Sequence, residues 1–76
     1  MTDQKPLTLD DFDLSREGDV VTIACEKANH KRDYTTIDIA MALDNWKTFT
    51  QNEVMFGKRK VDRRIWIQVL ERAVKL

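Results

Sequence analysis

Lysine and arginine are concentrated in one short stretch of the chain, directly before its last apolar segment. Five cations fall within the seven positions 58–64, and Asp62 is the one acid among them. A cation run of this density can bind the phosphates of a nucleic acid or the carboxylates of an acidic protein. It can also be a solvated loop, or pair with acids at the start of the same chain. The residues predicted here to bind nucleic acid are Lys58, Arg59, Lys60, Arg63 and Arg64.

Two further cations, Lys31 and Arg32, lie in a polar stretch that is typical of a hairpin tip. They are predicted to add secondary phosphate contacts if the hairpin tip lies near the main cation run. Tyr34 and Trp46 supply aromatic rings that could stack on bases, although the helical spacing of Trp46 favours a core position. The first functional hypothesis is therefore a nucleic-acid-binding or transcription-associated regulatory protein, whose ligand is DNA in single- or double-stranded form.

Residue types that carry catalysis or bind metals are sparse. His30 is the single histidine and Cys25 the single cysteine, whereas a zinc site needs about four ligands. Cys25 ends an alternating apolar strand that points it toward the core, where a thiol acts as a small hydrophobic group. With only two glycines, the chain also has no glycine-rich loop to bind phosphates. The sequence predicts that the protein is not an enzyme and that it has no metal and no cofactor.

The charge balance supports a second hypothesis. The thirteen acids and thirteen bases give a net charge of zero, but residues 1–26 carry seven acids and two bases. The rest of the chain carries eleven bases and six acids, so the two parts have charges of −5 and +5. A neutral total with an acidic first segment is typical of a protein-binding module as well. The alternative function is therefore a small adaptor or inhibitor that masks a partner protein.

Length and composition predict one domain over residues 1–76, with residues 1–6 as a flexible tail. A single cysteine excludes an intrachain disulfide and favours a reducing compartment. The chain has no apolar run of the ~18 residues that a membrane span needs, and its start lacks the apolar core of a signal peptide. We therefore expect a cytoplasmic protein that has no membrane partner.

Periodicity predicts an α+β fold: a small antiparallel sheet of two to four strands, followed by two helices that cover one face. The β-branched run from Val20 to Cys25 predicts the best strand. The segment from Tyr34 to Phe49 is ambiguous, because it fits a strand followed by a helix and also a single helix that starts at Thr36 behind a Thr35 cap. The preferred interpretation has a strand to about Ile39 and a helix over about 42–52, with Leu43, Trp46 and Phe49 on the core side.

The last segment has the clearest period and predicts a C-terminal helix over about 62–75, with Asp62 as its N-cap. Its apolar arc spans roughly 200°, wider than the roughly 100° stripe of an ordinary surface helix. The excess width predicts a second buried side, most simply in a twofold homodimer. The residues predicted for that interface are Trp66, Ile67, Leu70 and Val74.

Overall fold

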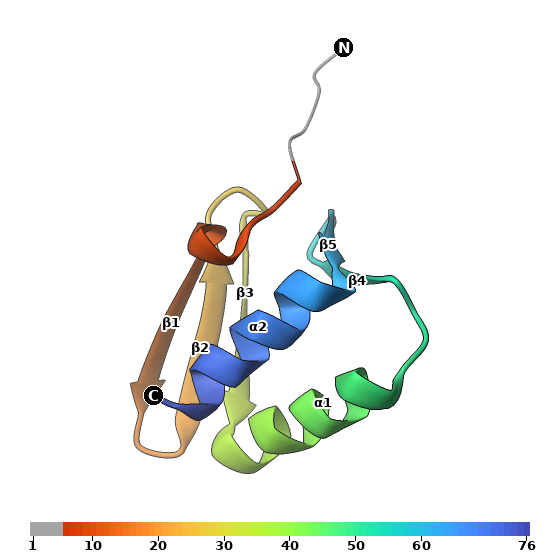
Figure 1. Cartoon of the computed structure of the whole chain (residues 1–76). Coiled ribbons are helices and arrows are strands. Elements are labelled where there is room, and N and C mark those ends of the chain that lie inside the picture. The colour runs from red at the N-terminus through yellow and green to blue at the C-terminus, as the bar shows by residue number, and fades with distance from the viewer. Residues whose placement is uncertain (1–5) are drawn as a thin grey trace.

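Alternating β-branched residues place the best strand at the centre of a three-stranded antiparallel sheet. In the computed structural model, which describes residues 6–76, β2 (Val20–Cys25) pairs with β1 (Phe12–Glu17) on one side and β3 (His30–Thr35) on the other (Figure 1). A 3-10 turn, η1 (Leu9–Asp11), precedes β1. The α+β fold predicted from the sequence is confirmed. Of the tail predicted to be flexible, residues 1–5 lie outside the described residues.

Turn residues fix the register of the sheet. Glu17 pairs with Val20, so β1 and β2 are joined by a two-residue turn in which Gly18 has a φ of +60°. A turn of this kind requires a positive φ, which glycine adopts without steric cost. The longer loop between β2 and β3 ends at Asn29, whose φ of +50° turns the chain into β3. His30 to Asp33, predicted as part of a polar loop, belong to that strand.

The first helix, α1 (Thr36–Thr48), begins earlier than the preferred interpretation placed it. The ladder between β2 and β3 ends with the pair Val20 and Thr35, so β2 offers no partner to the residues that follow. The Thr35 hydroxyl oxygen accepts a hydrogen bond from the amide of Asp38 at 3.0 Å and caps the helix. The prediction of a strand to Ile39 and a helix over 42–52 was therefore wrong, and the single helix from Thr36 is correct.

A second, two-stranded sheet follows α1 and was not predicted. It consists of β4 (Glu53–Phe56) and β5 (Arg59–Asp62), joined by a two-residue turn at Gly57, whose φ is +63°. The chain then enters α2 (Arg63–Val74). The carboxylate of Asp62 accepts a hydrogen bond from the amide of Arg64 at 2.8 Å, so the predicted C-terminal helix and its N-cap are confirmed.

Both helices lie on the same face of the three-stranded sheet, and the β4–β5 hairpin lies beyond the start of α2 (Figure 1). Alternation along β2 sends Val21, Ile23 and Cys25 into the core beneath α2. Aromatic side chains from β1, β4 and α2 meet in this core, where Phe12, Phe56 and Trp66 contact one another edge to face or tilted. No element of the described residues covers the opposite face of the sheet. No helix within the described residues is long and apolar enough to cross a membrane.

Candidate nucleic-acid interface

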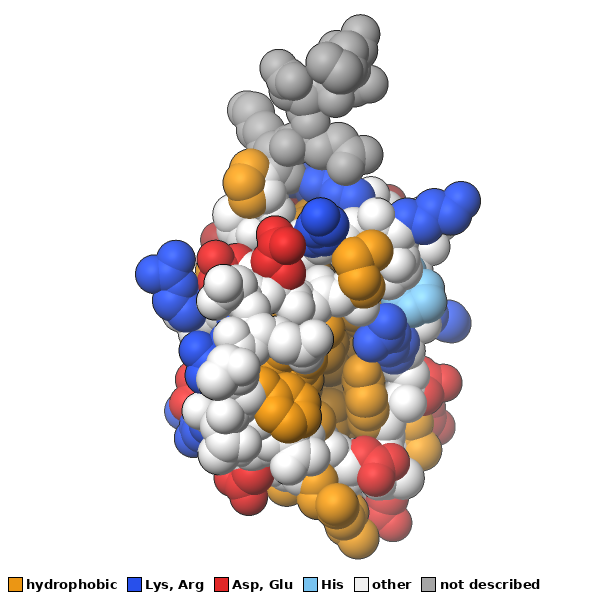
Figure 2. Space-filling model, turned by 90° about the vertical axis from the view of Figure 1, so that its right-hand side faces the viewer, with side chains coloured by type: hydrophobic (Ala, Val, Ile, Leu, Met, Phe, Trp, Pro, Cys, Tyr) orange, Lys and Arg blue, Asp and Glu red, His pale blue; other side chains and the backbone are white. Residues whose placement is uncertain are grey.

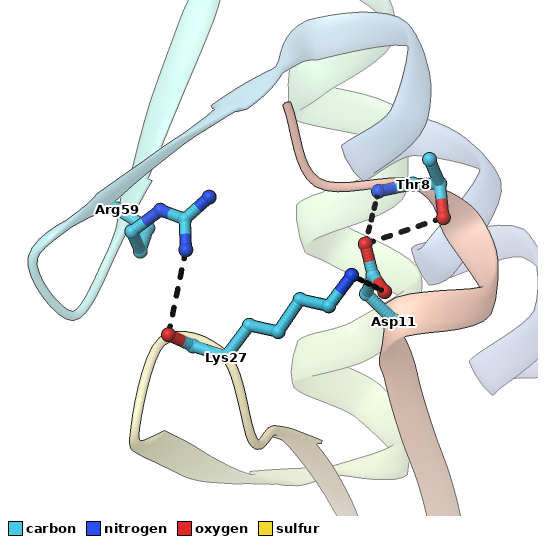
Figure 3. A network of polar contacts seen from close by, with 4 residues as sticks. All are labelled: Thr8, Asp11, Lys27 and Arg59. Atoms are coloured by element: carbon cyan, nitrogen blue, oxygen red, sulfur yellow. Dashed lines mark hydrogen bonds and ion pairs between the residues drawn. The ribbon is translucent and has the colours of Figure 1, made fainter. Parts of the chain in front are cut away.

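Two hairpin tips that are far apart in the sequence are packed together at one end of the molecule. The turn at Gly57 lies so close to the β2–β3 loop that an added Cβ would stand 2.8 Å from the Cβ of His30. The Nη1 of Arg59 donates a hydrogen bond to the carbonyl oxygen of Lys27 at 3.4 Å, across 32 positions of sequence (Figure 3). Cations of both tips therefore share one end of the molecule. We call it the basic end: Lys27, Lys31, Arg32, Lys58, Arg59 and Lys60.

Three lysines of the basic end extend into solvent. Lys31, Lys58 and Lys60 are all exposed. No hydrogen bond or ion pair joins Lys31 or Lys58 to any other described residue. The ammonium group of Lys60 lies 4.0 Å from a carboxylate oxygen of Glu53, and an exposed pair at that distance contributes little. The structure thus places the predicted Lys31 and Lys58 at the same end of the molecule, with charges that are available to a ligand.

Arg32, by contrast, holds the hairpin onto the sheet. Its guanidinium carbon lies 5.2 Å from the centre of the Phe56 ring, and its Nη2 donates to the carbonyl oxygen of Met55 at 2.9 Å. Its Nε donates to the Nε2 of His30 at 3.2 Å. These contacts occupy donors that a phosphate would need, so the primary role of Arg32 is to join β3 to β4.

The acidic first segment pairs with the basic end at one point among the described residues. The ammonium group of Lys27 lies 2.8 Å from the carboxylate of Asp11 (Figure 3). That carboxylate also accepts hydrogen bonds from the amide and hydroxyl of Thr8. The hydrogen bond from Lys27, followed by that from the Thr8 amide, lowers the pKa of Asp11. The acid therefore pairs with Lys27, which the sequence interpretation did not include, and not with the cluster after Gly57.

Arg63 and Arg64, predicted to contact phosphates, both have partners within the fold. The Nε and Nη2 of Arg63 donate to the carbonyl oxygens of Trp46 and Lys47, each at 3.2 Å. These carbonyls lie in the last turn of α1, where backbone acceptors lack helical partners and a cation is favoured. Arg64 pairs with the N-cap carboxylate of Asp62 at 3.3 Å. That side-chain bond, together with the bond from the Arg64 amide, lowers the pKa of Asp62.

We expect Arg63→Gln to lower the free energy of unfolding by about 1 kcal/mol, because two charge-assisted hydrogen bonds to the end of α1 are lost. Arg64→Gln is the matched control. Its side chain is exposed and meets only the neighbouring Asp62, so its effect should stay within about 0.5 kcal/mol. Urea denaturation of both variants measures the difference. Equal stability of the two variants would contradict a structural role for Arg63.

The residues predicted to form a dimer interface divide into two groups. Trp66 is 2% exposed and Leu70 is fully buried, both within the core of the single chain. Ile67 is half-buried and Val74 is exposed. The wide apolar arc of α2 is thus covered largely by the chain's own sheet, α1 and hairpin. A self-association surface through Trp66 or Leu70 would require the core to open.

The open face of the sheet has the wrong charge for a phosphate backbone. By register, its outward side chains include the acids Asp13, Glu17 and Asp33 and a single cation, Lys31. Lys31 lies at the end of this face nearest the β2–β3 loop, so an anionic ligand is favoured at that end and disfavoured along the rest of the sheet. No group of three potential metal-ligating side chains occurs in the described part of the chain.

Comparison with known proteins assigns no family to the chain. No family model matches it, and no curated protein or solved structure is significantly similar to it. Any functional assignment must therefore rest on the site itself.

Proposed function

We propose that this protein binds nucleic acid without catalysing a reaction, and that the basic end supplies its phosphate contacts. The observation that carries the proposal is the packing of the Gly57 turn against His30, which places Lys31 and Lys58 at one end of the molecule. Lys58 in the hairpin turn and Lys31 near the start of β3 can both contact a phosphate backbone and release its counterions. Because the net charge is zero, this contact is local, and we expect weak affinity with a strong dependence on salt. Such binding suits a regulatory protein of the cytoplasm.

Lys31→Gln combined with Lys58→Gln tests the proposal. We expect this double variant to bind a labelled oligonucleotide at least about tenfold more weakly near 0.1 M salt. Its plot of log affinity against log salt should be flatter by up to about two units. Fluorescence anisotropy at several salt concentrations gives both quantities.

Arg72→Gln combined with Lys75→Gln is the matched control. It removes the same charge from the far end of α2, where both side chains are exposed. Its salt slope should stay close to that of the unmodified protein, because these residues lie at the opposite end from the two hairpin tips. Equal losses in the two double variants, or no oligonucleotide binding at low salt, would overturn the proposed function.

A second candidate function, as a protein-binding adaptor or inhibitor, is favoured by the end of the molecule opposite the basic end. The Thr36 amide donates to the carbonyl oxygen of Asp19, and the Nη1 of Arg16 donates to that of Leu76. These bonds hold the β1–β2 turn, the start of α1 and the end of α2 together. Ile37 lies at this end and is 70% exposed, although a large apolar side chain is usually buried. The exposed apolar residues of this end are Val20, Ile37, Met41, Val74 and Leu76. Absence of oligonucleotide binding would favour this surface, and sedimentation equilibrium would test whether it serves a homodimer.

A further inference from the structure

Two aromatic side chains at the end of α1 are only partly covered by the rest of the fold, although Trp46 also packs against the core. The rings of Trp46 and Phe49 meet edge to face, with centroids 5.1 Å apart. Phe49 is 43% exposed, and Trp46 is only half-buried. Figure 2 shows the side of the molecule on which α1 ends and leads to β4, where hydrophobic side chains lie in a recess between other side chains and backbone. Exposed rings in such a position are available to a planar partner.

The aromatic pair borders the hairpin that carries the basic end. The guanidinium of Arg63 donates a hydrogen bond to the carbonyl oxygen of Trp46. The backbone amide of Arg63 donates to the carbonyl oxygen of Asn52, which lies directly before β4. Met55 of β4 is 48% exposed and is paired across the hairpin with Lys60. In Figure 2, cations and the single histidine lie beside the hydrophobic side chains toward the upper part of this face, and acidic side chains border them below. We call these partly exposed apolar side chains the aromatic surface: Trp46, Phe49 and Met55.

We propose that the ligand of the basic end is a single-stranded nucleic acid, whose unpaired bases stack on the aromatic surface. This inference rests on the proposed function and names its ligand. Phosphates next to Lys58 and Lys60 would leave bases free to reach Phe49, whereas the bases of a duplex are already stacked on one another. Stacking on an aromatic ring is tolerant of base identity, because every base has a π-face. Cations beside exposed aromatic rings are the combination that such strands require.

Replacement of Phe49 separates stacking from simple apolar contact. We expect Phe49→Leu, which keeps an apolar side chain but removes the ring, to weaken binding of a labelled oligothymidine of about twenty nucleotides by about fivefold or more. Phe49→Tyr keeps a ring and should bind like the unmodified protein. Both variants change an exposed position, and circular dichroism should confirm that each is folded. A duplex of the same length should bind more weakly and respond to neither change.

Tryptophan fluorescence gives a second readout. Trp66 is buried, so quenching on addition of oligothymidine reports on Trp46. The quenching should disappear in Trp46→Phe and persist in Trp66→Phe. Equal affinity for single strands and duplex, together with unchanged binding by Phe49→Leu, would overturn the inference and leave phosphate binding intact. If neither form binds at low salt, the proposed function and the inference both fail.

Discussion

Replacing Phe56 with alanine is expected to lower the free energy of unfolding by about 3–5 kcal/mol, the range for a large aromatic in a core. Phe56 is fully buried, although its strand has only four residues. Its ring centre lies 5.4 Å from that of Phe12, 5.6 Å from that of Trp66 and 4.9 Å from that of His30. The side chain of Phe56 therefore joins the β4–β5 hairpin to β1, α2 and β3 at once.

A loss of this size is a large part of the whole stability. A domain of this length has a free energy of unfolding of roughly 4–11 kcal/mol, at about 0.05–0.15 kcal/mol per residue. Met55→Ala is the matched control, because Met55 is the neighbouring residue on the exposed face of the same strand. It should change stability by less than about 0.5 kcal/mol. Urea denaturation followed by circular dichroism compares the two, and a similar loss in both would show that the hairpin is not anchored by Phe56.

Elements with a period of their own could be predicted from the sequence. β2 alternates cleanly and α2 has a helical apolar stripe, so both were found with nearly correct ends. β4 and β5 were missed because each has four residues, and β5 contributes only Val61 to the core. Gly57, between the apolar residues 54–56 and the basic residues 58–60, was the one available signal of a turn. Such short strands are specified by their docking onto the core more than by local pattern.

The boundary between β3 and α1 depended on a distant part of the chain. Residues after Thr35 have a strand-like composition, and Thr35 is also a good helix cap. β3 ends at Thr35 because Thr35 pairs with Val20, the first residue of β2, so the residues after Thr35 have no strand to pair with. Because α1 begins and ends earlier than predicted, Phe49 lies outside the helix. It was predicted on the core side, yet it follows the last residue of α1 and is largely exposed.

Sequence proximity grouped the cations of the candidate site, but it did not show which of them bond within the fold and which extend into solvent. Arg32 and Arg63 have become internal hydrogen-bond donors, whereas Lys31 and Lys58 extend into solvent. The planar fork of arginine suits fixed carbonyl acceptors, and the lysine ammonium is more strongly hydrated. That difference between the two residue types could have indicated which cations bond within the fold. The acceptors themselves were not predictable, because they depend on where α1 ends and on how the hairpin docks.

Two glycines with nearly the same backbone conformation should respond very differently to substitution. Gly57 has a φ of +63° and Gly18 a φ of +60°, and each lies in a two-residue turn of a β-hairpin. Alanine in this left-handed region costs about 1–2 kcal/mol at either position. At Gly18 an added Cβ meets no atom within 4 Å, so Gly18→Ala should show that cost alone.

Gly57→Ala should cost more, about 2–4 kcal/mol in total, because steric overlap adds to the backbone cost. The added Cβ would lie 2.8 Å from the Cβ of His30 and 3.3 Å from the carbonyl oxygen of Ala28. His30 cannot readily move away, because its ring packs on Phe56 and accepts the hydrogen bond from Arg32. Relief of the overlap therefore requires the two hairpin tips to separate, which would also divide the basic end. Chemical denaturation of both variants decides the matter: equal losses of stability at Gly18 and Gly57 would mean that the tips are not in contact.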